Sequence, residues 1–153
     1  MDFKEEMKDS FTIAGFSAPG TWNGNAVHPI PDLWKKAYEV FENQSPEHIT
    51  GVCLPPRSND YFYTCGIELD YVDYKKIGEG MTVHIFPAHK YVVFKHIGSA
   101  HNIPETYGEI WRIFDQQGYS ITKGMPEIEV VPLQLFGKEY TDEYEMEIWI
   151  PVD

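Results

Sequence analysis

Two glutamates and a tryptophan near the C-terminal end form the first pattern that could do chemistry. Glu145, Glu147 and Trp149 occupy odd positions of a run over residues 144–152, whose even positions are apolar from 144 to 150. Side chains alternate between the two faces of a strand, so the carboxylates and the indole share one face. A ring beside a carboxylate is half of a box for an organic cation, in which the ring contributes about 0.5–2 kcal/mol. The alternative is a solvated strand face on which both glutamates meet water.

A third carboxylate, Glu129, shares a predicted strand face with Val131, Leu133 and Leu135. If that face is buried, the charge requires a partner, because an unpaired carboxylate in an apolar interior is strongly destabilising. A ligand cation could be that partner. Alternatively, Glu129 lies near the margin of the sheet and reaches water.

Tyr107 and Trp111 belong to an apolar stripe at helical spacing that also contains Ile110 and Phe114. Most of such a stripe packs into a core, but the two larger rings could form a pocket wall. The six histidines show no metal-ligand spacing, and there is no nucleophile elbow, phosphate loop or dinucleotide fingerprint. We therefore expect no metal and no cofactor.

Composition sets further bounds. The 153 residues fit one domain, and 42% hydrophobic with 15% aromatic residues is typical of an ordered protein with aromatic side chains to spare. A net charge of -12 repels phosphate backbones, so direct nucleic-acid binding is not expected. The sequence has neither a signal-peptide pattern nor an apolar run that could span a bilayer, which predicts a cytoplasmic protein with no membrane segment. Cys53 and Cys65 are predicted to be reduced core residues.

The order of predicted elements repeats. A strand over residues 11–17 precedes a helix that starts near Pro31, and strands follow over residues 50–54 and 61–69. The second half has a strand over 90–97, a helix over 104–117, and strands over 127–135 and 144–150. A shift of 73 residues superimposes the helices: Pro31, Trp34, Tyr38, Phe41 and Gln44 fall on Pro104, Tyr107, Trp111, Phe114 and Gln117.

The repeat predicts an α+β fold of duplicated strand-helix-strand-strand units, with halves of about 9–80 and 81–153 in one domain over residues 1–153. The halves would form a pseudo-twofold antiparallel sheet with both helices on one face. The opposite face, or the seam between the halves, would then be open to a ligand. The competing explanation is that any two amphipathic helices starting at a proline look alike.

Four segments in order carry a family resemblance: residues 91–98 (YVVFKHIG), 107–111 (YGEIW), 126–129 (PEIE) and 147–152 (EIWIPV). From about Asp9 onward the chain resembles the GyrI-like family, which also supplies the effector-binding domain of AraC-type and MerR-type multidrug regulators. The resemblance implies a pocket for lipophilic, often cationic, aromatic compounds around a central carboxylate. Glu129 best matches that carboxylate by position. Tyr107, Trp111 and Tyr144 match its aromatic walls, and Glu147 is a supporting acid.

The resemblance leaves three functions open. The first is binding of small hydrophobic or cationic ligands by a stand-alone sensor or sequestering protein, because the chain has no room for the helix-turn-helix of the regulators. The second is a metal-independent hydrolase of reactive cyclopropane-containing compounds that uses Glu129, Glu147 or both. The third is inhibition of a protein target such as a topoisomerase. The sequence leaves monomer and dimer equally open.

Overall fold

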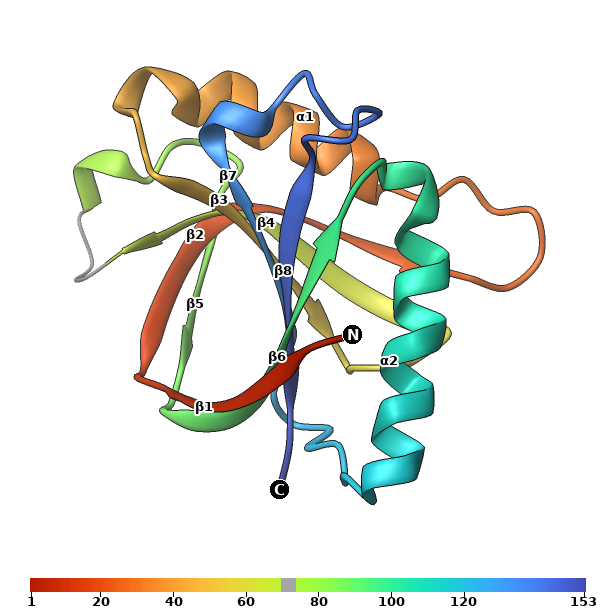
Figure 1. Cartoon of the computed structure of the whole chain (residues 1–153). Coiled ribbons are helices and arrows are strands. Elements are labelled where there is room, and N and C mark those ends of the chain that lie inside the picture. The colour runs from red at the N-terminus through yellow and green to blue at the C-terminus, as the bar shows by residue number, and fades with distance from the viewer. Residues whose placement is uncertain (70–73) are drawn as a thin grey trace.

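The sheet of this protein is built almost entirely from long-range strand pairs. In the computed structural model, residues 1–69 and 74–153 are described, and they form two α-helices and eight strands in one sheet (Figure 1). In chain order the elements are β1 Phe3–Lys8, β2 Phe11–Thr21, α1 Ile30–Phe41, β3 His48–Leu54, β4 Asp60–Leu69, β5 Thr82–Phe86, β6 His89–Ile97, α2 Ile103–Gln117, β7 Glu127–Pro132 and β8 Glu145–Pro151.

The sheet confirms the predicted duplication. Its order is β1-β6-β8-β7-β3-β4-β2-β5, with every pairing antiparallel. From the central β7–β3 pair outward, one half contributes β7, β8 and β6, and the other contributes β3, β4 and β2 in the same sequence of positions. The two strand-helix-strand-strand units are therefore related by a pseudo-twofold axis between β3 and β7.

Two strands were not predicted, and they join the halves. Two residues separate β1 from β2, and two separate β5 from β6, yet β1 and β5 each pair with a strand of the opposite half: β1 with β6, and β5 with β2. β1 was missed because its sequence is polar and mostly exposed, without the apolar alternation that marks a half-buried strand. The exchange fastens the outer edge of each half to the other.

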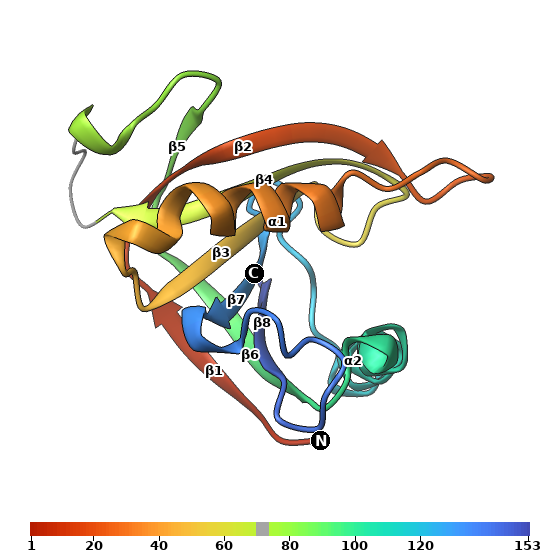
Figure 2. The ribbon, with the colours of Figure 1, turned by 90° about the horizontal axis from the view of Figure 1, so that it is seen from above.

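Both helices cover the same face of the sheet. α1 buries Leu33, Ala37 and Phe41 against β2, β3 and β4, and α2 buries Ile110, Ile113 and Phe114 against β6 and β8. α1 runs across the view in both overview figures, whereas α2 stands upright in Figure 1 and is seen end-on in Figure 2. The helices are thus steeply inclined to each other, and their N-terminal ends flank the seam between the halves.

The opposite face of the sheet has its own apolar core. A second cluster of buried side chains forms there, and Trp149 packs against it. Its members are Phe11, Ile13, Val52, Phe86, Tyr91, Met125 and Ile128. The sequence left two places open for a ligand, the opposite face of the sheet and the seam between the halves. Side chains fill the first of them.

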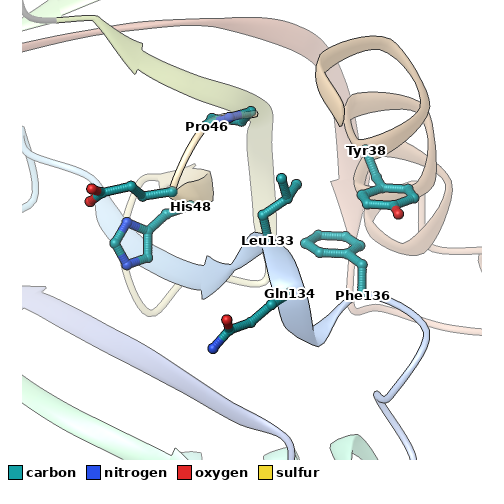
Figure 3. A pocket seen from close by; sticks show the side chains of 7 residues that line it. Tyr38, Pro46, His48, Leu133, Gln134 and Phe136 are labelled. Carbon is teal, nitrogen blue, oxygen red and sulfur yellow. The ribbon is translucent and has the colours of Figure 1, made fainter. Parts of the chain in front are cut away.

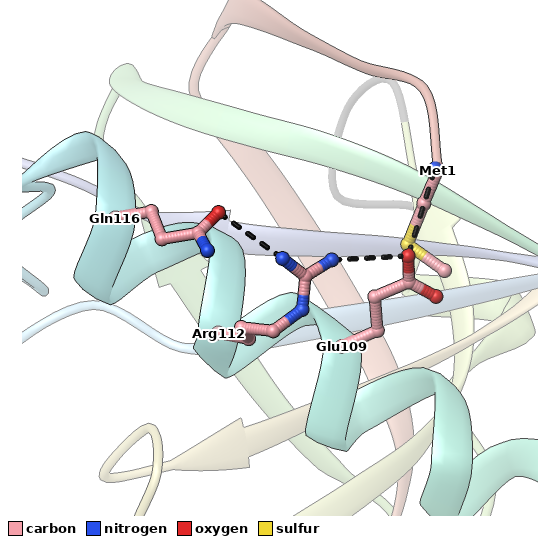
Figure 4. A network of polar contacts seen from close by, with 4 residues as sticks. All are labelled: Met1, Glu109, Arg112 and Gln116. Atoms are coloured by element: carbon pink, nitrogen blue, oxygen red, sulfur yellow. Dashed lines mark hydrogen bonds and ion pairs between the residues drawn. The ribbon is translucent and has the colours of Figure 1, made fainter.

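The N-terminal strand ties α2 to the sheet. The Met1 amino group lies 3.6 Å from Glu109 Oε1, which is also 3.4 Å from Arg112 Nη2 in a small polar network on α2 (Figure 4). The Phe3 ring packs on Phe94, with centroids 5.7 Å apart. The start of the chain therefore contacts both the sheet, through β1, and the outer surface of α2.

One predicted strand is too long. The strand predicted over residues 127–135 ends at Pro132, and Leu133–Leu135 form a single 3₁₀ turn whose Leu133 N–H donates to Glu47 O at 3.0 Å. Proline cannot donate to a sheet ladder, so it ends the strand. The helices of the described residues include none that is long and apolar enough to cross a lipid bilayer.

Candidate functional site

A cavity of about 1060 Å³ lies at the seam, between the two helices and the central strands. This volume is at the upper end of the range for small-molecule sites. Its walls come from both helices, the β3–β4 loop, β7 and the segment that follows β7. Nine aromatic side chains line it: Trp22, Trp34, Tyr38, Tyr63, Tyr107, Trp111, Phe136, Tyr140 and Tyr144.

Glu129, on β7, presents its carboxylate to this cavity. The Tyr63 hydroxyl donates to Oε1 at 2.6 Å, and the Tyr107 hydroxyl donates to Oε2 at 3.0 Å. The Trp34 indole N–H in turn donates to the Tyr63 hydroxyl at 3.0 Å. Each carboxylate oxygen therefore has one donor, and the donors come from different halves of the repeat, since Tyr63 is on β4 and Tyr107 on α2.

These contacts satisfy the carboxylate without neutralising it. Burial raises the pKa of Glu129, and the hydrogen bonds from Tyr63 and Tyr107 oppose that rise. Burial and the neighbouring Glu129 hold the pKa values of both tyrosines well above their usual range, so the phenols remain donors. None of the ion pairs formed within residues 1–69 and 74–153 involves Glu129. The carboxylate thus has two hydrogen-bond donors and no ion-pair partner among the described residues.

Gly51 provides the space for this arrangement. It pairs with Glu129 across β3 and β7, and a Cβ at this position would collide with the Tyr63 hydroxyl and lie 2.9 Å from the Trp34 ring. Glycine inside a strand often marks such a close approach, and this signal was present in the sequence. The missing side chain lets the Trp34–Tyr63–Glu129 hydrogen-bond chain form.

Glu127 is a second cavity carboxylate that the sequence interpretation missed. It is only 8% exposed, and its Oε1 accepts the Arg57 backbone N–H at 2.8 Å. The pKa of Glu127 is raised to about 7, mainly by burial and also by the Glu129 charge, against the lowering effects of the Arg57 N–H and the Arg57 charge. The strand alternation that singled out Glu129 applies equally two residues earlier, so the pattern itself contained this residue.

Arg57 closes the wall beside Glu127. Its backbone has φ of 48°, and its guanidinium lies over the Trp111 ring at 4.7 Å from the centroid. The Trp111 ring also contacts the buried Phe114 ring edge to face. Trp111 therefore both lines the cavity and packs against the core. Tyr144, immediately before β8, lines the cavity too, and burial together with Glu129 raises its pKa.

The structure thus brings Glu129, Tyr107, Trp111 and Tyr144 together and separates Glu147 and Trp149 from them. Met146, Ile148 and Ile150 of β8 point to the helix face, so Glu147 and Trp149 point to the other side of the sheet. There the Trp149 indole donates to Glu147 Oε2 at 2.9 Å. Glu147, predicted from the sequence as a supporting acid, is therefore absent from the lining of the cavity that Glu129 faces.

A cation does lie against Trp149, but it belongs to the chain itself. The Lys8 ammonium is 5.2 Å from the Trp149 ring centroid, 4.7 Å from that of Phe11, and 2.8 Å from Glu68 Oε1. The cation box read from the sequence is thus occupied internally.

The repeat explains why the cavity is aromatic. Trp34 and Tyr38 of α1 are the 73-residue equivalents of Tyr107 and Trp111 of α2, and all four line the cavity. The sequence interpretation assigned only the second-copy residues to a wall. Applying the repeat to the first copy would have found the other two.

Within the described part of the chain, no group of three or more histidine, cysteine or acidic side chains is arranged to hold a metal ion.

Comparison with known proteins agrees with this architecture. The family model described as GyrI-like small molecule binding domain matches residues 1–153. The transcriptional regulator BrlR of Pseudomonas aeruginosa is 28% identical over 108 residues, which span 68% of this chain and 38% of BrlR. The chain thus corresponds to well under half of that relative's length.

Two solved structures share the fold. SAV2435 bound to tetraphenylphosphonium has a TM-score of 0.76 at 20% identity, covering 100% of this chain and 94% of that one. The C-terminal domain of EcmrR has a TM-score of 0.72 at 14% identity, covering 99% and 97%.

The raised pKa of Glu127 predicts a specific pH dependence of stability. Because the folded pKa of about 7 exceeds the ordinary 4.5, the folded state keeps a proton that the unfolded chain releases. The stability from this group is complete below its unfolded pKa and is lost as the pH rises through its folded pKa. Glu127→Gln keeps the acceptor for Arg57 but cannot ionise. In urea unfolding it should match wild type near pH 4 and exceed it near pH 8 by up to about 3 kcal/mol.

Glu39→Gln, which removes the same charge from the exposed surface of α1, is the control and should run parallel to wild type at both pH values. Parallel curves for Glu127→Gln would contradict the assignment of this titration to Glu127.

Gly51→Ala should destabilise the fold, because the added methyl must displace Tyr63 or Trp34 from a packed seam. Overpacking of this kind costs about 1–3 kcal/mol, measurable as a lower thermal midpoint. Gly124→Ala is the matched control, since a Cβ there meets nothing within 4 Å. Equal midpoints for the two variants would show that the seam yields without strain.

Proposed function

We propose that this chain, which belongs to the GyrI-like small-molecule-binding family, binds small lipophilic cations in the seam cavity. Many of these cations would be aromatic, and Glu129 would be their counter-charge. Trp34, Tyr107, Trp111 and Tyr144 would form the walls around the bound rings. The proposal concerns binding alone and assigns no transcriptional role.

The observation that carries the proposal is the state of Glu129. Its carboxylate is positioned by two tyrosine hydroxyls, faces a cavity walled by aromatic rings, and forms none of the ion pairs found in the described chain. A bound organic cation would supply the missing charge where water is largely excluded, and the ring faces would add cation–π attraction. Three acidic side chains, Glu127, Glu129 and Glu139, line the cavity against two basic ones, Lys35 and Arg57, so an anion is disfavoured. A neutral ligand would leave the Glu129 charge uncompensated.

The relatives support the same chemistry. SAV2435 shares the fold and was solved with tetraphenylphosphonium, a lipophilic cation with four phenyl rings. At 20% identity this likeness extends to the fold only, so the assignment of a cation to this chain depends on Glu129 and its surroundings.

Glu129→Gln should weaken tetraphenylphosphonium binding by about tenfold or more, because close charge pairs in desolvated sites contribute upward of about 1.5 kcal/mol. The amide keeps the size and one acceptor oxygen, and its NH₂ group faces one of the two tyrosine hydroxyls, so the loss reports the charge together with one changed hydrogen bond. Titration calorimetry and quenching of cavity tryptophan fluorescence both measure it.

The matched control is Glu147→Gln, which removes one charge from a neighbouring strand on the other face of the sheet. Affinity should stay within about twofold of wild type there. Equal losses in the two variants would indicate attraction by the net charge of the protein, and an unchanged affinity in Glu129→Gln would refute the proposal.

A second candidate is hydrolysis of a reactive cyclopropane-containing genotoxic compound, favoured by the presence of two carboxylates of unlike environment in one cavity. Glu147, half of the catalytic pair predicted from sequence, lies across the sheet, so Glu127 is the acid available to work with Glu129. One carboxylate would take a proton from a water molecule while the oxygen of that water attacks a ring carbon. The ring C–C bond would break, its electron pair moving into a conjugated carbonyl that receives a proton from the other acid.

Mass analysis after incubation decides between the candidates. A hydrolase yields product heavier by one water, lost in both Glu127→Gln and Glu129→Gln, whereas a binding protein returns the compound unchanged. Product formed equally by Glu127→Gln would remove Glu127 from the mechanism.

A further inference from the structure

A second hollow, which we call the outer groove, lies behind the aromatic wall of the seam cavity. It has a volume of about 630 Å³ and is lined by Tyr38, Pro46, Glu47, His48, Leu133, Gln134 and Phe136 (Figure 3). It is formed where the chain enters β3 and where it turns after β7, with the last part of α1 along one side. Leu133, Pro46 and the two rings give it an apolar floor.

Two side chains are common to the outer groove and the seam cavity. Among the residues of both linings, Tyr38 and Phe136 alone occur twice. Their rings are stacked nearly parallel, with centroids 4.7 Å apart and planes inclined by 7°. The two spaces are therefore separated by one pair of stacked rings.

The two rings are held differently. Tyr38 projects from α1, whose neighbouring residues Ala37 and Phe41 are fully buried, so its backbone is fixed. Phe136 follows the 3₁₀ turn Leu133–Leu135 and precedes Gly137, which has φ of 90° and lies in the turns between β7 and β8. Parting the stack would require Phe136 to move away from Tyr38, and it also contacts the Trp34 ring, with centroids 6.0 Å apart.

We propose that the outer groove is a second subsite for ligands of the seam cavity, and that it takes the flexible hydrocarbon chain of an elongated lipophilic cation. The inference rests on the proposed function. The charged, ring-bearing head occupies the seam cavity beside Glu129, and the chain passes between Tyr38 and Phe136 onto Leu133. The ligand class thereby includes cations with a long unbranched substituent that extends past the ring pair.

The geometry suits a polymethylene chain. Such a chain contacts an aromatic face at about 3.5–4 Å, so it fits between two rings whose separation has widened by a few ångströms. The chain would replace the lost ring contact with two new ones and would bury further methylenes in the groove. Each methylene fully removed from water strengthens binding by up to about fourfold.

The test compares methyl-, butyl- and decyl-triphenylphosphonium, each kept below its micelle concentration, on wild type and on Gln134→Trp. Gln134 is an exposed residue of the groove wall, and tryptophan there would fill the groove without entering the seam cavity. In wild type the decyl compound should bind about tenfold or more tightly than the butyl compound. In Gln134→Trp that gain should fall to about twofold, while methyl-triphenylphosphonium binds as it does to wild type.

Gln117→Trp, on the exposed end of α2, controls for a new tryptophan elsewhere and should keep the full gain. A gain that is absent in wild type, or that persists in Gln134→Trp, overturns the subsite while leaving the proposed function in place. Failure of all three cations to bind wild type overturns both.

Discussion

The partly buried carboxylate of Glu129 imposes the constraint on which the rest of the site depends. A charge in this position requires donors on both oxygens, and it receives them from Tyr63 on β4 and Tyr107 on α2. The two tyrosines belong to opposite halves of the repeat, so the carboxylate is satisfied only where the halves meet. Gly51 adds a steric condition at the same point, because the strand facing Glu129 must leave room for the Tyr63 hydroxyl. Hydrogen bonds meet the need for donors, and no ion pair within the described residues compensates the charge, which is the basis for the proposed ligand site.

Duplication of the unit provides the aromatic walls, and the pairing of β1 and β5 with the opposite half holds the two halves together. Two copies of an amphipathic helix present equivalent rings, Trp34 and Tyr38 from one and Tyr107 and Trp111 from the other, to a common space. If each half were held only by the central β3–β7 pair, the halves could open about it. β1 and β5 pair across to the other half at the two outer edges, which restricts that motion. A large cavity can therefore exist inside an otherwise well-packed protein.

The sequence predicted the elements that show periodicity and failed where periodicity is weak. Both helices, the duplicated order and the side of the sheet that they cover were confirmed, because apolar stripes and turn residues report burial directly. The polar β1 shows no such pattern and was missed. For the site, alternation places Glu129 on a buried face, but it cannot tell which of two faces holds a cavity and which a core. That distinction depends on the long-range packing of helices and strands, which the local sequence pattern does not specify.

Comparison of the two faces shows why a ring beside a carboxylate does not by itself make a ligand site. The combination occurs twice, as Trp149 with Glu147 on one face and as the ring-lined Glu129 on the other. On the first face Lys8, next to the β1–β2 turn, places its ammonium over Trp149 and against Glu68, so the chain supplies its own cation. On the second face the cavity lies between the two helices and the central strands. The described chain pairs no lysine or arginine with Glu129. The same local chemistry thus closes one face and leaves the other open, and the deciding variable is whether the fold can deliver a cation of its own.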